Sequence, residues 1–358
     1  MKNTLMLNGQ EVAFEPGQTL LEVANTAGIE IPTLCFVKDA VPHGACRICV
    51  IEVDGQDELL PACETFAAEG LVVETDTLRV RQTRADILQM LVASPSNGYD
   101  SRATMADGGT AAGASLRALL AEYNVADQDK TAAKNFPLDD DHHLIRRDFS
   151  HCIQCGRCLA ACNEVQVNGA IPHPYERRAD NTLPTGWYPV ADYDACTYCG
   201  ECVQNCPAGA LQDKKAGANI DADLPIETVR TTCAYCGVGC QVNLHVQRGR
   251  VVKVTGVEDA IPNRGRLCVK GRFGYDFIHS DDRLTSPLIR NGDGFREASW
   301  EEALELVGEK LAALRDEHGG DCLAGLTSAR VSNEENYLMQ RLVRAGFGTN
   351  NIDHCARL

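Results

Sequence analysis

The chain has 358 residues, of which 44% are hydrophobic and 23% charged, proportions that are ordinary for a globular protein of two to four domains. A formal net charge of −16 argues against nucleic acid as a partner, because its phosphates would be repelled. No apolar run approaches the roughly 18 residues that a membrane span requires, and the opening MKNTLMLNGQEVAF lacks an export signal, so we expect a cytoplasmic protein with no membrane span.

Cysteine is the residue type that most restricts the possible functions. The chain contains 18 cysteines, which in a reducing compartment are not expected to form a disulfide framework. Sixteen of them fall into four groups of four, and thiolates in such groups bind iron–sulfur clusters or zinc. The remaining two, Cys322 and Cys355, are expected to be small buried hydrophobic residues.

Residues 1–80 predict a small sheet with one helix. An Asn-Gly pair at 8–9 between alternating apolar residues indicates a two-residue hairpin, and Thr19 with Glu22 forms a capping box. Four cysteines follow in loops, namely Cys35, Cys46, Cys49 and Cys63. This unit is similar to the ferredoxin-like β-grasp domain that heads the large peripheral subunit of complex I, iron-only hydrogenases and some formate dehydrogenases. The resemblance implies one [2Fe-2S] cluster on these cysteines, and zinc stays open as the alternative.

Residues 81–145 form the second predicted segment. The sequence VRQTRADILQMLVAS indicates an amphipathic helix, with an apolar face made of Ile87, Leu88, Leu91 and Val92. In the similar proteins a His-x3-Cys-x2-Cys-x5-Cys segment follows and holds a further cluster. Here the matching spacing falls on Asn97, Ser101, Thr104 and Thr110. Neutral amides and hydroxyls are poor ligands for iron, so we predict a degenerate segment without this cluster.

Residues 146–222 contain two C-x2-C-x2-C-x3-C motifs, the most specific pattern in the chain. In such pairs the fourth cysteine of each motif completes the other cluster. We therefore assign one [4Fe-4S] centre to Cys152, Cys155, Cys158 and Cys206. The second [4Fe-4S] centre is assigned to Cys196, Cys199, Cys202 and Cys162. Asn163 replaces the proline that usually follows the motif, which removes no ligand.

Residues 226–358 begin with the last cysteine group. Its C-x2-C-x3-C-x27-C pattern comprises Cys233, Cys236, Cys240 and Cys268. Three thiolates on one tight loop and a fourth returned by a hairpin can enclose a third [4Fe-4S] cluster, whereas structural zinc usually takes paired knuckles. Two alternating strands joined at 248–249 supply the hairpin, and the strand–helix alternation after Lys270 predicts the start of an α/β domain.

The run from Cys233 through CVKGRFGYDFIHSDDRLTSPLIR to NNIDHCARL resembles the catalytic subunit of molybdenum- or tungsten-dependent formate dehydrogenases. The resemblance implies a metal bound by two pterin–guanine dinucleotides and an α/β molybdopterin oxidoreductase domain, which makes the whole chain a multidomain α+β protein. In that family the lysine after the fourth cysteine lies between cluster and pterin, which implies that Lys270 is on the electron path. Without the resemblance, a solvated surface lysine is the simpler interpretation.

The last residues, DHCARL, end one position before the place where that family carries its metal ligand, a selenocysteine or cysteine. Because UGA encodes selenocysteine and is conventionally translated as a stop, we hypothesise that the sequence ends at such a codon. A deliberate or annotated truncation is the alternative. His354, Cys355 and Arg357 adjoin the expected metal site by motif alone.

The resemblance implies interconversion of formate and CO2, with electrons leaving singly through the clusters. No nicotinamide or flavin motif occurs, so we expect a partner subunit of the diaphorase (flavin and NAD(P)), ferredoxin-linked or hydrogenase type to accept them. Two alternatives stay open: a non-catalytic electron-transfer subunit like that of the complex I peripheral arm, and another bis-pterin oxidoreductase such as a nitrate reductase.

Overall fold

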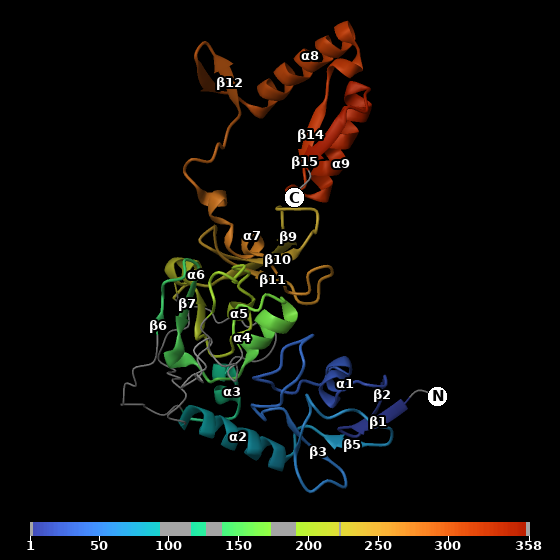
Figure 1. Cartoon of the computed structure of the whole chain (residues 1–358), viewed down its shortest axis with the longest axis vertical. Helices are drawn as coiled ribbons and strands as arrows, with labels where there is room; N and C mark the ends of the chain where they lie inside the picture. Colours follow the sequence, from blue (N-terminus) through green and yellow to red (C-terminus); the bar gives the residue numbers. More distant parts are fainter. Residues whose placement is uncertain (1–2, 94–115, 127–137, 173–190, 222, 356–358) are drawn as a thin grey trace. The chain divides into compact units, whose positions relative to one another are not determined.

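The computed structural model describes residues 3–93, 116–126, 138–172, 191–221 and 223–355. The chain divides into two compact units, Met1–Pro225 and Ile226–Leu358 (Figure 1). Helices and strands are mixed along both units, as the predicted α+β class requires. The finer division into four domains stays a prediction.

The first unit opens with a five-stranded mixed sheet in the order β2-β1-β5-β3-β4. The predicted hairpin is confirmed, since β1 and β2 are antiparallel and Asn8 and Gly9 both have positive φ. β1 and β5 are parallel, and β3 is antiparallel to both β5 and β4. The strands are β1 (Asn3–Leu7), β2 (Gln10–Phe14), β3 (Val50–Val53), β4 (Leu60–Pro61) and β5 (Val72–Glu74).

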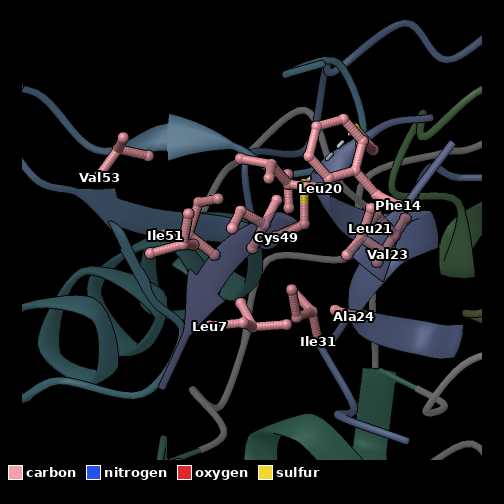
Figure 2. Close-up of a cluster of buried hydrophobic side chains, with 14 residues drawn as sticks. Leu7, Phe14, Leu20, Leu21, Val23, Ala24, Ile31, Cys49, Ile51 and Val53 are labelled. Atoms are coloured by element: carbon pink, nitrogen blue, oxygen red, sulfur yellow. Dashed lines mark hydrogen bonds between the residues drawn. The ribbon is translucent and has the colours of Figure 1, made fainter. Parts of the chain in front are cut away.

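Helix α1 (Leu20–Thr26) packs its apolar residues into the core of this sheet. Its predicted capping box is present, because the Thr19 side chain accepts from the Glu22 amide and the Glu22 carboxylate accepts from the Thr19 amide. Figure 2 shows that the core includes a cysteine, Cys49, beside Leu20 and Ile51. A cysteine of the first group is therefore part of the hydrophobic core of the sheet.

Helices α2 (Leu78–Ala93) and α3 (Leu116–Glu122) form a second core with residues from both sides of them in the sequence. The predicted apolar face of α2 is confirmed, with Leu88 and Val92 buried in this core. The same face buries Arg84, which the apolar pattern did not predict. Its guanidinium donates to the Tyr123 hydroxyl and to the carbonyls of Val50 and Thr75, so the charge is held by three oxygens.

A three-stranded antiparallel sheet, β6-β7-β8, supports the two ferredoxin motifs. Its strands are β6 (Leu138–Asp139), β7 (Ile145–Asp148) and β8 (Leu211–Asp213). Short helices carry the motifs and their flanks: η1 (Phe149–His151), α4 (Arg157–Ala160), η2 (Ala161–Val165), α5 (Glu201–Gln204) and α6 (Lys214–Asn219).

The second unit starts with the antiparallel sheet β11-β10-β9, and the predicted hairpin at 248–249 joins β10 to β11. The elements are β9 (Glu227–Thr232), β10 (Gln241–Gln247), β11 (Arg250–Gly256), α7 (Val269–Phe273) and η3 (Asp276–His279). A small core made of Val242, Val254, Leu267 and Tyr275 is flanked by Cys233 and Cys240.

The remaining elements, orange to red in Figure 1, alternate between strand and helix as predicted. They are β12 (Leu288–Asn291), β13 (Gly294–Glu297), α8 (Trp300–His318), η4 (Gly320–Cys322), β14 (Gly325–Ser328), α9 (Asn333–Arg341), η5 (Leu342–Phe347) and β15 (Ile352–Cys355). Strand β14 pairs only with the parallel β15 among the described strands, so Leu326 is 78% exposed.

Candidate iron–sulfur sites

The first cysteine group is brought together by loops on either side of β3. Cys35, Cys49 and Cys63 are buried and Cys46 is half-buried. The Sγ atoms of Cys49 and Cys63 lie 3.5 Å apart, although 14 residues separate them in the sequence. Cys35 and Cys46 form the second hydrogen-bonded pair of thiols.

The electrostatics of this group favour metal binding. The hydrogen bond from Cys35, together with backbone amides at Leu34 and Ile48, lowers the pKa of Cys46 to about 6. The hydrogen bond shared with Cys63 likewise lowers the pKa of Cys49, while the pKa values of Cys35 and Cys63 are raised. Since the thiolate is the form that binds metals, four converging sulfurs with two acidic members fit a [2Fe-2S] cluster.

The first ferredoxin motif meets the last cysteine of the second motif. Cys152, Cys155, Cys158 and Cys206 line one cavity. Burial raises the pKa of Cys152 to about 11 and that of Cys155 to about 12, and it raises the pKa of Cys158 well above its ordinary value. A bare thiolate is therefore disfavoured there, and bound iron would supply the positive charge that the anions need.

The second motif meets the last cysteine of the first in the same way. The pKa of Cys202 is raised to about 12, first by burial and further by the nearby thiols Cys199, Cys162 and Cys196. Cys162 lies on the π-helical turn η2, where backbone amides of Ala170 and Ile171 partly oppose the effect of its burial. The structure thus brings together both groupings that the motif spacing predicted, and each fits a four-thiolate cluster.

The two motifs repeat one backbone conformation. Gln154 and Tyr198 have φ of 56° and 58°, and Gly156 and Gly200 have φ of 74° and 71°. The left-handed turn directs the amide of Gln154 at the sulfur of Cys152 over 3.4 Å, and the amide of Tyr198 makes the equivalent contact with Cys196. Amide-to-sulfur bonds of this kind orient a ligand and stabilise its charge.

Asn163, which replaces the usual proline, has a structural role. Its Nδ2 donates to the carbonyl of Ile171 over 2.7 Å, and the amide of Asn168 donates to the carbonyl of Cys162. These bonds close the turn after Cys162 without the fixed φ of a proline. The prediction that no ligand is lost by this replacement agrees with the position of Cys162 beside the second motif.

Residues 1–80, called the head from here on, contact the first ferredoxin motif directly through a loop. The Nε2 atom of His43 lies 3.0 Å from the carbonyl oxygen of Cys155, and the Val41 amide donates to the Glu164 carboxylate over 2.7 Å. The hydrophobic core formed with α2 and α3 also includes Cys46 and Cys155. Sequence reasoning missed His43; its place before Gly44 and the C-x2-C pair was the only local signal.

Three members of the last cysteine group lie on the loop that joins β9 to β10, and Cys268 directly precedes α7. The Cys233 amide donates to the Cys240 carbonyl over 2.7 Å, which closes the loop that also carries Cys236. Cys233, Cys236 and Cys240 are half-buried, whereas Cys268 is exposed. A negative charge on Cys268 would raise the pKa of both Cys233 and Cys240, which means that Cys268 lies near these two thiols.

Asn263 returns the chain to this loop, a role that sequence reasoning missed. Its Oδ1 accepts from the amide of Gln241, and its Nδ2 donates to the carbonyls of Gln241 and Arg266. The buried Asn263 side chain therefore holds the segment that leads to Cys268 against the residue after Cys240. Three thiols on one loop and a fourth held in place by this amide fit a [4Fe-4S] cluster.

Lys270 follows on α7 and is half-buried. Its Nζ lies 5.9 Å from the centre of the ring of Tyr235, a residue between Cys233 and Cys236 in the sequence. Burial raises the pKa of the Cys233 thiol, and the positive charge of Lys270 acts in the opposite direction. Lys270 is thus beside the cysteine group, not on a remote part of the surface.

Several predictions need correction or stay open. Cys322 and Cys355 are exposed, not buried: Cys322 ends the short turn η4, and Cys355 ends β15, which pairs among the described strands only with β14. The sequence S-x-x-E at 299–302 also predicts a capping box; the Ser299 side chain does cap α8, but the Glu302 carboxylate binds Arg296 and does not complete the box. The positions of the predicted degenerate cluster site lie outside the described residues, namely Asn97, Ser101, Thr104 and Thr110.

Three features are absent from the described parts of the chain. No group of three or more His, Cys, Asp or Glu side chains is arranged there to hold a single metal ion. No helix in those parts combines the length and apolar character needed to cross a bilayer. No disulfide joins any of the 18 cysteines, all of which are described.

Four protein families match successive parts of the chain. Residues 2–78 match the 2Fe-2S iron-sulfur cluster binding domain, and residues 151–210 match the 4Fe-4S dicluster domain. Residues 226–280 match the molybdopterin oxidoreductase Fe4S4 domain, and residues 283–358 match molybdopterin oxidoreductase itself. These matches show the domain types of the iron–sulfur-containing molybdopterin oxidoreductase class along the chain, and they confirm the predicted order of those types.

Particular relatives within this class differ in their described activities. The NADPH-Fe(3+) oxidoreductase subunit alpha of Geobacter sulfurreducens (strain DL-1 / KN400) is 33% identical over 99% of this chain, and an NADH-quinone oxidoreductase subunit of Rhizobium meliloti is 34% identical over 98%. A putative formate dehydrogenase of Staphylococcus aureus (strain USA300) is 28% identical over 98%. The chain spans only 39% to 40% of the length of these proteins.

Proposed function

We propose that this chain is the electron-relay part of a formate dehydrogenase or CO2 reductase catalytic subunit. The observation that carries the proposal is the series of four converging thiol groups, the last of which has Lys270 beside Cys233 and leads into the molybdopterin oxidoreductase domain. The cofactors would be one [2Fe-2S] and three [4Fe-4S] clusters, with a molybdenum or tungsten bis-pterin guanine dinucleotide in the longer protein. That metal centre would supply the two-electron chemistry of formate and CO2.

The residues of this chain would bind and order the clusters. Lys270 would lie on the electron path between pterin and the Cys233 group, as the family resemblance implies. The head would deliver or receive electrons at the other end, because its cysteine group shares a core with the first ferredoxin motif. The metal's own protein ligand would be a selenocysteine or cysteine, as the family resemblance implies.

The proposed partner is a diaphorase-type subunit that uses a flavin and NAD(P). Two relatives carry NADPH or NADH in their names, which supports this choice over a ferredoxin-linked or hydrogenase partner. The proposed location is the cytoplasm, where reducing conditions keep the 16 candidate ligand cysteines available for iron.

The competing proposal is a non-catalytic electron-transfer subunit. It is favoured by the NADH-quinone oxidoreductase relative from Rhizobium meliloti, which is 34% identical to this chain, against 28% for the putative formate dehydrogenase. The two proposals share the clusters and differ in whether formate donates electrons. Another bis-pterin oxidoreductase, such as a nitrate reductase, is the third outcome.

The test is purification of the full-length gene product without oxygen, followed by metal and pterin analysis and formate-dependent dye reduction. Molybdenum or tungsten with pterin and formate-dependent reduction is expected. Absence of both would support the electron-transfer alternative, and pterin with nitrate but not formate turnover would support the third. In the active protein, Lys270→Met should slow formate-dependent dye reduction without loss of iron. The control is Lys310→Met, because this lysine is exposed on α8, a helix that carries none of the 16 candidate ligands.

Iron analysis tests the relay separately. We expect about 14 irons per chain, two in the head and four in each other centre. A content near 18 would show that the segment around Asn97 binds a further cluster. Zinc in place of iron would contradict the relay itself.

A further inference from the structure

The two ferredoxin motifs share a backbone frame but differ in one buried charge. Arg157 follows Gly156 and precedes Cys158, and Glu201 follows Gly200 and precedes Cys202. Both glycines have the same left-handed conformation, so Arg157 and Glu201 occupy equivalent positions of the repeat. Each is the first residue of its helix, α4 or α5. A cation at one centre therefore corresponds to an acidic residue at the other.

Both side chains are buried. Arg157 is 1% exposed and Glu201 is 5% exposed. One amide lies between them, since the Arg157 guanidinium donates to Oδ1 of Asn205 over 3.4 Å, and Nδ2 of Asn205 donates to the Glu201 carboxylate over 3.0 Å. Charges in such surroundings act on their neighbours far more strongly than solvated charges do.

Two other basic groups near the motifs each lie beside a carboxylate. Arg147 is buried and its charge acts on Cys202, but its guanidinium lies 3.5 Å from the Asp139 carboxylate and donates to the Tyr193 hydroxyl. Beside Cys152, His151 is 3.9 Å from the Asp148 carboxylate. Each of these two basic groups therefore has an acidic partner. Arg157 directly precedes a ligand of the first centre, and Glu201 directly precedes a ligand of the second.

We infer that Arg157 raises the reduction potential of the Cys152, Cys155, Cys158 and Cys206 centre, and that Glu201 lowers the potential of its twin. An added electron makes a cluster more negative, so a nearby cation stabilises the reduced form and a nearby carboxylate destabilises it. One electron passes from the reduced second centre to the oxidised first centre, and no proton or ligand is exchanged. The inference rests on the proposed cluster assignments, not on formate as substrate.

The favoured centre is the one that faces the head. Cys155 belongs to it, and the carbonyl of Cys155 is the contact point of His43 from the head loop. An electron shared by the ferredoxin pair would therefore reside mainly on the centre from which the [2Fe-2S] head is reached. The charge difference gives an otherwise symmetric pair a direction.

The test is a potentiometric titration of the iron-loaded full chain, followed by electron paramagnetic resonance of the two spin-coupled [4Fe-4S] centres. Arg157→Gln and Glu201→Gln should each narrow the separation between their midpoint potentials, and the double variant should narrow it most. We expect at least a tenfold change in the electron-partition constant for each variant, which is about 59 mV for a one-electron couple. Arg157→Lys, which keeps the charge, should restore most of the separation.

The control is Arg146→Gln, because this arginine lies on β7 with its side chain 42% exposed. It should leave both potentials unchanged. If the separation between the two midpoint potentials is unchanged or wider in iron-replete Glu201→Gln protein, the inference is wrong. If Arg157→Gln loses iron, the result for Glu201→Gln decides by itself. The titration uses no formate, so its outcome does not depend on whether the protein oxidises formate. An iron deficit in the unmodified chain would contradict the proposed relay, not the inference about Arg157 and Glu201.

Discussion

The cysteine groups of the two units differ in how deeply they are buried. Of the 12 candidate ligands between Cys35 and Cys206, seven are buried and none is exposed. Of the four between Cys233 and Cys268, none is buried and Cys268 is exposed. In the first unit, Cys49, Cys63 and Cys152 belong to hydrophobic cores themselves, whereas in the second unit Cys233 and Cys240 only flank a small one.

This difference in burial indicates that cluster binding and the stability of the fold depend on each other differently in the two units. Where ligands are core residues, as Cys49, Cys63 and Cys152 are, loss of iron removes the group that these core side chains bind, so iron and packing stabilise each other. Where three ligands lie on the loop between β9 and β10 and only flank a core, we expect the cluster to be lost while the sheet stays paired. The first unit should therefore hold its iron as part of its stability, and the second should not.

The largest expected effect is on iron release. Treatment of the iron-loaded chain with an oxidant and a chelator should remove about 4 of about 14 irons in a separate fast phase, which comes from the exposed group. Timed iron release and the visible absorbance measure this phase. In a Cys268→Ala variant the fast phase should be missing. A fast phase that persists in this variant, or that removes the ferredoxin signals first, would contradict the comparison.

The next effect concerns Arg84, a buried arginine on α2 in the first unit. Arg84→Met keeps the length of the side chain but leaves the Tyr123 hydroxyl and the carbonyls of Val50 and Thr75 without their donor. We expect a loss of about 3 kcal/mol in local stability, the cost of unsatisfied buried groups and a deleted charged donor. Amide hydrogen exchange of α2 and β3 measures it.

The matched control is Arg79→Met on the same helix, whose side chain is 52% exposed and pairs with Glu52. Its effect should stay within about 0.5 kcal/mol, as is usual for surface substitutions. Equal protection in the two variants would mean that Arg84 is not part of the structural core.

The sequence predicted the parts that depend on local chemistry. The Asn-Gly hairpin, the box at Thr19 and the crossed grouping of Cys162 and Cys206 follow from turn geometry, capping and motif spacing, and the structure has all three. The burial of Arg84 could not be predicted. A period of 3.6 residues identifies the buried face of a helix, but it does not show that a charged side chain on that face has hydrogen-bond partners. His43 was missed for a related reason, since its contact is with a carbonyl 112 residues away.

A smaller effect should follow from His142, a buried histidine beside the second ferredoxin motif. Its Nδ1 accepts from the amides of Leu144 and Ile145, and its ring lies 4.7 Å from that of Tyr198. Burial, reinforced by the charge of Arg147, lowers the pKa of His142 from 6.5 to about 4. The unfolded chain therefore binds more protons in this range, so the stability contributed by neutral His142 is present above pH 6.5 and is lost as the pH falls towards 4.

Protection factors of the Leu144 and Ile145 amides between pH 7 and pH 5 measure this contribution. His142→Asn supplies an oxygen acceptor that does not ionise in this range, so its protection should be less dependent on pH. His143→Asn replaces the exposed neighbour and should keep the unmodified slope. Identical slopes in all three proteins would exclude His142 as the source.

The smallest effect compares one capping device in both units. Thr19 caps α1, whose Leu20 and Leu21 are buried in the head core, and Ser332 caps α9, in which no residue is buried. Thr19→Ala and Ser332→Ala should each cost about 1 kcal/mol at the helix start. Because α1 packs against the core that contains Cys49 and Cys63, only Thr19→Ala should also speed the release of iron from the head. Thr26→Ala at the other end of α1 removes a hydroxyl but no cap, and iron release as fast in that variant as in Thr19→Ala would contradict the coupling of cap and cluster.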